Sequence, residues 1–221
     1  RLDSYFANTD YASQGLPDAE ELKLLERFRG QIPDEVFTIP FVMPFTNSDL
    51  YLNRINLRKA KKLLLDGGYT YSDELLIDPR TNKPVEIEMI YHFPGFERSL
   101  LCFKDNLAKI GISLKLRLID SSQFFKRMQN HDYDIITGAF APSTVPGRLE
   151  RQLWHSAADI EGGYNLSGVK SAVIDTLLDE MQSLKHKEEL ITYARALDRV
   201  LLWNFYSIPQ LYSNNIRLIY R

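Results

Sequence analysis

Strand-like and helix-like patterns alternate through the middle of the chain. Apolar residues recur at every second position over 85–91 and again over 112–118, and at helical spacing over 97–110. A strand, a helix and a strand joined by short connections form a parallel βαβ unit. A further apolar run over 133–140 predicts a third strand, and the short helix before it is expected to begin at Asp120.

Helical spacing of apolar residues also occurs on both sides of this core. Asp18 and Glu21 form a capping box, in which Asp18 accepts hydrogen bonds from the first turn and Glu21 reaches back. Asn56 is a favourable N-cap residue, and Ser171 lies where another helix is expected to start. The helices predicted in this way cover 18–30, 56–66, a stretch from about 171 onward, and 187–203.

The first part of the chain shows no steady period. Residues 1–17 mix aromatic and small polar side chains, and prolines punctuate the segment 31–53. A structureless loop of this length is uncommon inside a compact domain, so we interpret it as an arm packed over a surface. We therefore expect an irregular arm with one helix over residues 1–55 and an α/β lobe over residues 56–221.

Three parallel strands allow two layouts, and the pattern does not choose between them. The strands lie in sequential order, or the third crosses to the far side of the first. The second layout creates a switch point, beyond whose strand ends ligands bind in open α/β sheets. Aromatic rings and small polar groups in the loops after the first and third strands suit a ligand with a polar backbone. The candidate ligand-binding residues are Phe93, Phe96, Phe140, Ser143, Thr144, Arg148, Trp154 and Asn165.

Composition and charge exclude some classes of partner. Hydrophobic residues make up 44% and charged residues 25% of the 221 residues, which is typical of a globular chain. The formal net charge of −2 offers no field that would recruit nucleic acid. The single cysteine, Cys102, excludes an intramolecular disulfide, and we expect its thiol to be buried on the apolar face of its helix.

Motifs for catalysis are missing or weak. The chain lacks the phosphate-binding and dinucleotide glycine motifs, and it lacks the G-x-S-x-G nucleophile elbow. The candidate metal pairs are His131 with Asp132 or Asp134, and His155 with Asp159, but neither pair reaches the three protein ligands of a catalytic zinc. We therefore predict no cofactor, no metal and no catalytic residue.

Eight segments, in this order, resemble one family. They are LDSYFANTDYASQGLP with EELKLLE, RINLRKAKKLLLDGGY, DNLAKIGISLKLRLID, DYDI, VPG followed by Glu150, WHSAAD, YNLSGV and RALDRVLLWNFYSIPQLY. On these segments the chain resembles the C-terminal portion of the periplasmic oligopeptide-binding proteins of ABC importers, the extracellular solute-binding proteins of family 5. The YejA-like branch is the most similar.

The resemblance implies a type II periplasmic binding fold, in which two α/β lobes close on an extended peptide. This chain would supply the second lobe and the arm that follows the hinge. The implied partners are a peptide or peptide-like ligand, the membrane permease of the importer and the missing N-terminal lobe. The implied location is the periplasm of a Gram-negative bacterium.

The chain departs from the family pattern at two places. Relatives that bind free peptides often carry an aspartate shortly after the third strand, where it pairs with the terminal amine of the ligand. The matching stretch here, GAFAPST, has no acid, and the usual Pro-Gly-Asn-Glu reads PGRLE with Arg148. A modified, blocked or acidic peptide is therefore as plausible a ligand as a free one.

Two other functions stay open as alternatives. A small α/β hydrolase would use a site centred on His155 or His131. A protein-interaction adaptor would use the N-terminal arm to bind another protein. Ligand length, side-chain preference and oligomeric state have no signature in the sequence.

Overall fold

We describe a computed structural model of the chain. It describes residues 3–44, 50–140, 145–158, 160 and 163–209. The described residues form two compact units, the first made of residues 1–43 and 140–221 and the second of residues 44–139. This division differs from the expected boundary at residue 55, because the N-terminal segment packs with the C-terminal helices. The assignment of 1–55 and 56–221 to an arm and a lobe stays a prediction.

The second unit contains a three-stranded parallel sheet. Strand β4 (Glu86–Tyr91) lies in the middle and pairs in parallel with β5 (Ser113–Leu118) on one side and with β6 (Ile135–Ile136) on the other. The strand order β5-β4-β6 selects the second of the two layouts expected from the sequence. The predicted third strand is shorter than expected, with two residues rather than the whole of 133–140.

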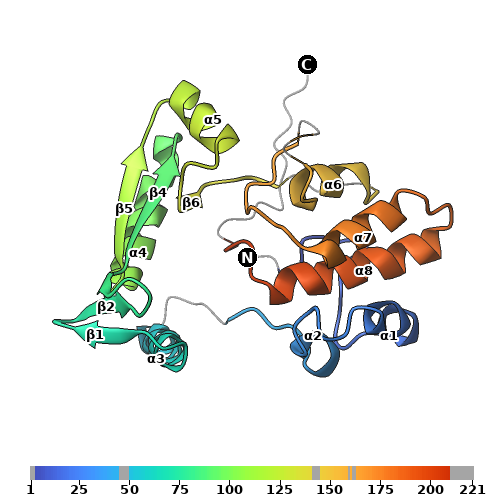
Figure 1. Ribbon diagram of the computed structural model, residues 1–221, viewed down its shortest axis with the longest axis horizontal. Coiled ribbons are helices and arrows are strands. Elements are labelled where there is room, and N and C mark those ends of the chain that lie inside the picture. The colour runs from blue at the N-terminus through green and yellow to red at the C-terminus, as the bar shows by residue number, and fades with distance from the viewer. Residues whose placement is uncertain (1–2, 45–49, 141–144, 159, 161–162, 210–221) are drawn as a thin grey trace, which may run out of the picture. The chain divides into compact units, whose positions relative to one another are not determined.

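Helix α4 (Glu97–Ala108) covers one face of this sheet (Figure 1). Met89 and Tyr91 of β4 and Leu114 of β5 point toward it, and Leu100 of α4 completes the buried cluster. The opposite face carries charges, since Glu86 pairs with Lys115 at 2.5 Å. Helix α5 (Ser121–Gln129) connects β5 to β6, and Asp120 caps it by accepting from the Gln123 amide at 3.0 Å, as predicted.

A second, antiparallel sheet extends this unit. It consists of β1 (Thr70–Ser72), β2 (Leu75–Asp78) and β3 (Lys83–Pro84), in that order. Helix α3 (Leu50–Asp66) packs its apolar face against Leu76 of β2 and against Ile110 and Ile112. Asn56 lies inside α3 rather than at its N-cap, so the predicted start of this helix is wrong by six residues. The basic residues of α3 are exposed: Arg54, Arg58, Lys59, Lys61 and Lys62.

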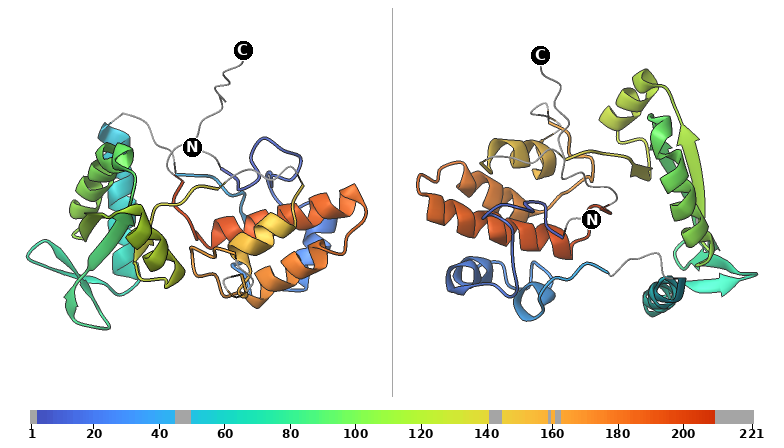
Figure 2. Two further views of the ribbon diagram at one scale, coloured as in Figure 1. Left: turned by 90° about the horizontal axis from the view of Figure 1, so that it is seen from above. Right: turned by 180° about the vertical axis from the view of Figure 1, so that it is seen from behind.

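The first unit is a helical cluster. Helices α7 (Ala172–Met181) and α8 (Lys187–Trp203) lie side by side (Figure 2), and α1 (Ala19–Glu26) packs against α8. Two short helices, α2 (Glu35–Thr38) and α6 (Arg148–Trp154), complete it. Leu25, Leu177 and Leu197 are fully buried at its centre. Asp18 caps α1 and Ser171 caps α7 as the sequence predicts.

The environment of the single cysteine differs from the one expected. Cys102 is exposed on α4, so the prediction of a buried thiol is wrong, because the sheet takes up only the opposite side of this helix. At the C-terminal end, the sequence pattern over 205–221 predicts two extended segments joined by a polar turn, and residues 210–221 lie outside the described residues. Among the described residues, none of the helices is both long enough and apolar enough to span a membrane.

Candidate functional site

The carboxyl ends of β4 and β6 form the first part of the candidate site. The two strands are neighbours, with Ile90 opposite Ile136, and the Thr137 amide continues the pairing by donating to the Ile90 carbonyl at 3.3 Å. The segments that follow both strands therefore leave the sheet at the same edge. The β5-β4-β6 order makes this edge a switch point, the place where α/β sheets bind ligands.

Two phenylalanines follow β4 at this edge. Phe93 is 56% exposed and Phe96 is 37% exposed, and their rings meet edge to face at 5.4 Å. Pro94–Phe96 forms a 3-10 turn, η1, that leads into α4. Gly95 permits this arrangement, since a Cβ atom there would collide with the ring of Phe93. The two rings form an exposed apolar surface of the second unit, and their contact with a ligand stays a prediction.

A second aromatic group lies in the first unit. The ring of Phe140 stacks on Trp154 at 5.2 Å with an interplanar angle of 20°. Phe140 is 42% exposed, whereas Trp154 is only 2% exposed. Trp154 therefore packs against the Phe140 ring from the buried side, and the Phe140 ring stays partly exposed to solvent. Direct contact between Trp154 and a ligand stays a prediction.

Arg148 and Asn165 occupy different environments in this unit. Arg148 is exposed at the first residue of α6. Asn165 is 2% exposed, and its amide group donates to the Val169 carbonyl at 2.8 Å and accepts from the Val169 amide at 2.9 Å. The side chain of Asn165 thus closes a turn in the backbone. Ser143 and Thr144 lie outside the described residues.

The described residues around Glu150 explain the VPG motif in structural terms. Glu150 is buried, and its carboxylate accepts from the Gly147 amide at 2.5 Å. This interaction caps the first turn of α6, whose last residue is Trp154. Glu150 therefore fixes the start of the helix that carries Trp154.

His155, one of the candidate catalytic histidines, is buried and hydrogen-bonded. Its Nδ1 atom accepts from the Ala157 amide at 3.0 Å, and its Nε2 atom faces carboxylates of Asp175 at 3.8 Å and Asp179 at 3.5 Å. Asp159, its proposed partner at a metal, lies outside the described residues. Over the part of the chain that the structure describes, no three His, Cys, Asp or Glu side chains are placed to hold a metal.

The DYDI motif also has a structural explanation. Asp134 accepts from the Glu88 amide at 2.8 Å, and Asp132 pairs with Arg127 of α5 at 2.9 Å. Arg127 reaches Glu88 of β4 as well, at 2.5 Å. These bonds tie the entry of β6 to the central strand and to the helix before it. They hold the edge strand of the sheet in register.

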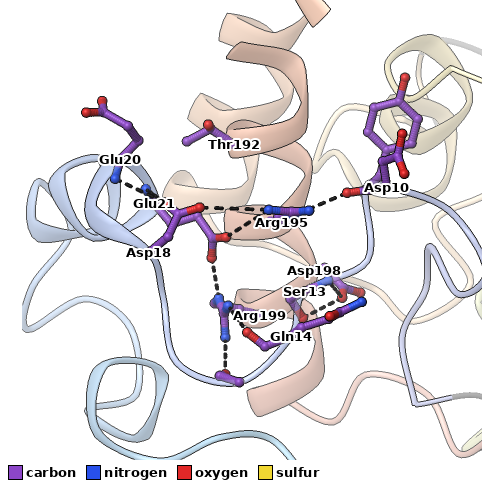
Figure 3. A network of polar contacts seen from close by, with 12 residues as sticks. Asp10, Ser13, Gln14, Asp18, Glu20, Glu21, Thr192, Arg195, Asp198 and Arg199 are labelled. Atoms are coloured by element: carbon purple, nitrogen blue, oxygen red, sulfur yellow. Dashed lines mark hydrogen bonds and ion pairs between the residues drawn. The ribbon is translucent and has the colours of Figure 1, made fainter. Parts of the chain in front are cut away.

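A buried polar network joins the N-terminal segment to α8 (Figure 3). Asp198 accepts from the Tyr5 amide at 2.9 Å and from the Ser13 amide and hydroxyl at 3.0 and 2.7 Å. Arg199 donates to the Glu21 carboxylate at 2.6 Å and to the carbonyl groups of residues 14, 15 and 16. Glu21 is thus turned toward Arg199, so the prediction that it reaches back to cap α1 is wrong. The pKa values of Glu21 and Asp198 are raised, because the effect of burial exceeds that of the hydrogen bonds, which lower them.

The network also includes a residue beside the aromatic stack that the sequence did not single out. Tyr5 contacts both members of the aromatic stack, with ring centroids 5.0 Å from Trp154 and 6.3 Å from Phe140. Tyr5 lies in LDSYFANTDYASQGLP, one of the segments that carry the family resemblance. This segment has no helical or strand-like periodicity from which the position of the Tyr5 side chain could be predicted. A contact between residues so far apart in sequence follows from the tertiary fold alone.

Comparison with known proteins places these features in a family. The family model of the bacterial extracellular solute-binding proteins, family 5 middle, matches residues 24–159. The chain is 36% identical over 221 residues to a probable peptide-binding protein YejA of Agrobacterium fabrum, covering 100% of this chain and 36% of that protein. It is 28% identical over 214 residues to the peptidoglycan-binding protein YepA of the same organism, covering 96% of this chain and 34% of that protein. The chain thus spans about a third of the length of these curated relatives.

A solved structure shows the same fold. The oligopeptide-binding protein AppA of Bacillus subtilis, in complex with a nonapeptide, superposes with a TM-score of 0.62 at 19% sequence identity. The match covers 85% of this chain and 38% of that protein. At this identity the likeness concerns the fold, and it agrees with the type II periplasmic binding fold expected from the sequence.

Proposed function

This chain belongs to the bacterial extracellular solute-binding proteins of family 5, and we propose on this premise that it is the peptide-binding second lobe of an ABC importer's receptor. The proposed parent is a two-lobe protein of the periplasm, with a peptide or modified peptide as ligand and a membrane permease as partner. The family and its structural neighbours are binding proteins, which supports a non-catalytic role for this chain. The alternatives of a hydrolase or an adaptor gain no support from the comparisons.

One observation carries the proposal. The family match at residues 24–159 includes the whole β5-β4-β6 sheet, both exposed phenylalanines after β4, and Phe140. The proposed ligand contacts are therefore Phe93 and Phe96 in the second unit and Phe140 and Arg148 in the first. Exposed aromatic faces suit a ligand that offers apolar side chains.

A peptidoglycan-derived peptide is a second candidate ligand. The stretch after β6, GAFAPST, offers no acid for a free terminal amine. A relative 28% identical to the chain is named a peptidoglycan-binding protein. A peptide whose amine is blocked or linked to sugar would not need that acid.

Calorimetry with the full-length protein tests the proposal. Three probes separate the ligand classes: unmodified trialanine, N-acetylated trialanine and a murein tripeptide. We expect at least one to bind, and Phe140→Leu to weaken that binding. Phe205→Leu is the matched control, because Phe205 is an exposed phenylalanine of the same unit that contacts Trp203 rather than Trp154. Absence of heat with all three probes, and absence of any peptide in the mass spectrum of the purified protein, would contradict the proposal.

A further inference from the structure

Tyr5 is held at both ends by the C-terminal part of the chain. Its backbone amide donates to Asp198 at 2.9 Å across 193 positions of sequence. Its hydroxyl group shares a hydrogen bond of 2.8 Å with the Ser207 hydroxyl, across 202 positions. A side chain fixed at its backbone and at its far end has little freedom to turn.

The held ring of Tyr5 braces the aromatic stack. It meets Trp154 edge to face at 73° and Phe140 at 89°, while Phe140 and Trp154 are nearly parallel at 20°. Edge-to-face and stacked pairs are both favourable geometries for aromatic rings. Tyr5 and Trp154 therefore support Phe140 from two directions, which leaves its remaining surface toward solvent.

Asp198 is itself fixed, so the support is rigid. Ser13 gives it two further hydrogen bonds, and the neighbouring Arg199 binds three carbonyl groups of the same N-terminal segment. The segment that carries Tyr5 is thereby attached to α8 on both sides of Tyr11. A ligand-facing ring is most effective when its supporting shell is rigid, because less freedom is lost on binding.

We infer that Tyr5 is a positioning residue of the ligand site, anchored by Asp198 and Ser207, which holds the exposed ring of Phe140 in the orientation that meets the ligand. The inference rests on the proposed function, since it takes Phe140 as a ligand contact. It adds a residue that touches no ligand and acts through Phe140. A tyrosine with a purely structural role would affect stability without affecting affinity.

A double-mutant cycle on affinity separates these roles. The full-length protein is titrated with whichever of the three peptide probes binds most tightly, using Tyr5→Leu, Phe140→Leu and the double variant. We expect Tyr5→Leu to weaken binding by about threefold to tenfold, the range that one aromatic pair provides. In the Phe140→Leu background the same substitution should cause no further loss, because its target is gone.

Tyr11→Leu is the matched control. Tyr11 lies in the same segment and is 8% exposed in the same core cluster, so its loss destabilises the unit at least as much. We expect Tyr11→Leu to leave affinity unchanged under conditions where the protein stays folded. An equal loss of affinity in Tyr11→Leu and Tyr5→Leu would overturn the inference, since general destabilisation would then explain both.

The remaining outcomes distinguish this inference from the proposed function. If Phe140→Leu leaves affinity unchanged, the proposed ligand site fails and the inference fails with it. If Phe140→Leu weakens binding but Tyr5→Leu does not, or the two losses add, only the inference fails. Should Tyr5→Leu not fold, Tyr5→Phe removes the bond to Ser207 and keeps the ring. In full-length protein whose other tryptophans, Trp203 included, are replaced by phenylalanine, Tyr5→Phe should change the near-ultraviolet circular dichroism of Trp154, and an unchanged band would overturn the inference.

Discussion

Asp198 and Arg199 are adjacent residues of α8, and both are buried at 0% and 3% exposure. Their side chains satisfy the polar groups of a segment that has no regular structure of its own. Buried polar groups are costly unless they are hydrogen-bonded. The side chains of Asp198 and Arg199 therefore stabilise the folded position of the N-terminal segment, whose backbone groups they bind. This explains why RALDRV and LDSYFANTDYASQGLP occur together in the family resemblance: they form the two halves of one network.

Replacing Asp198 tests this network. Asp198→Asn keeps the shape but turns one acceptor into a donor that faces the Ser13 or Tyr5 amide. We expect the free energy of unfolding to fall by about 2 kcal/mol, because one buried amide loses its partner. Urea denaturation near neutral pH measures this loss.

A control at an exposed aspartate completes the test. Asp10 pairs with Lys187 at 3.1 Å on the surface, where ion pairs contribute little. Asp10→Asn should therefore change the free energy of unfolding by no more than about 0.5 kcal/mol. Equal losses in the two variants would show that burial of Asp198 is not what makes it important.

At the scale of elements, Gly111 joins α4 to β5 and also meets the antiparallel sheet. Its φ angle is +80°, and a Cβ atom there would come within 2.7 Å of the Glu74 carbonyl oxygen and the Leu76 amide nitrogen. The Gly111 carbonyl also accepts from the Leu76 amide at 2.9 Å. The glycine thus allows the β2 strand to lie directly against the turn before β5.

Gly111→Ala should strongly destabilise the second unit. We expect a loss of about 2–4 kcal/mol, because backbone strain adds to a collision with two backbone atoms, and the Leu76 amide among them is hydrogen-bonded. Both tryptophans, Trp154 and Trp203, lie in the first unit. The far-ultraviolet circular dichroism of Gly111→Ala should therefore show an earlier transition, while its tryptophan fluorescence transition stays in place.

Gly68→Ala is the matched control in the same unit. Gly68 has a φ angle of +87°, and its nearest neighbour to a Cβ atom is the Pro79 ring at 4.0 Å. This substitution carries strain without collision, so we expect a loss of only about 1 kcal/mol. A joint shift of the dichroism and fluorescence transitions in Gly111→Ala would contradict independent unfolding of the two units.

An ion pair links three helices of the first unit. Arg27, just after α1, donates to both carboxylate oxygens of Glu180 in α7, at 2.9 and 2.6 Å, and Tyr193 of α8 donates at 2.9 Å. The Arg27 guanidinium holds the pKa of Glu180 below its ordinary value of 4.5. The folded unit therefore binds this proton less tightly than the unfolded chain does.

The sign of the pH dependence follows from this shift. The contribution of Glu180 is complete above about pH 4.5 and is lost as the pH falls through the lowered folded pKa. Glu180→Gln should reduce the acid-induced loss of stability by up to about 1 kcal/mol, since the pair is partly exposed and screened. Denaturation at a series of pH values measures the effect.

At the scale of the whole molecule, the proposed function assigns this chain one lobe of a two-lobe receptor. A ligand that contacts one lobe leaves much of its surface in water, so little binding energy remains after the entropic cost of association. We expect the isolated 221 residues to bind the peptide probes at least roughly tenfold more weakly than the full-length protein. Calorimetry on both proteins measures the difference. Equal affinities would show that these 221 residues form a complete site.

The sequence by itself determined most local features. Periodicity and caps located α1, α4, α5, α7 and α8, and the alternating apolar residues located β4 and β5, because these signals depend on residues a few positions apart. The ordered motifs determined the family, and the loop after β4 supplied two exposed rings. The length of β6 and the start of α3 were predicted less well, because edge pairing and packing override local preference.

Only the tertiary structure decided the strand order, the partner of Glu21, the burial of Trp154 and the place of Tyr5. Each depends on contacts between residues far apart in the chain, such as the 193 positions that separate Tyr5 from Asp198. Local patterns carry no record of which distant side chain will satisfy a buried group. The physical reason is that a polar atom requires a partner when it is buried, while the fold as a whole determines which partner is near.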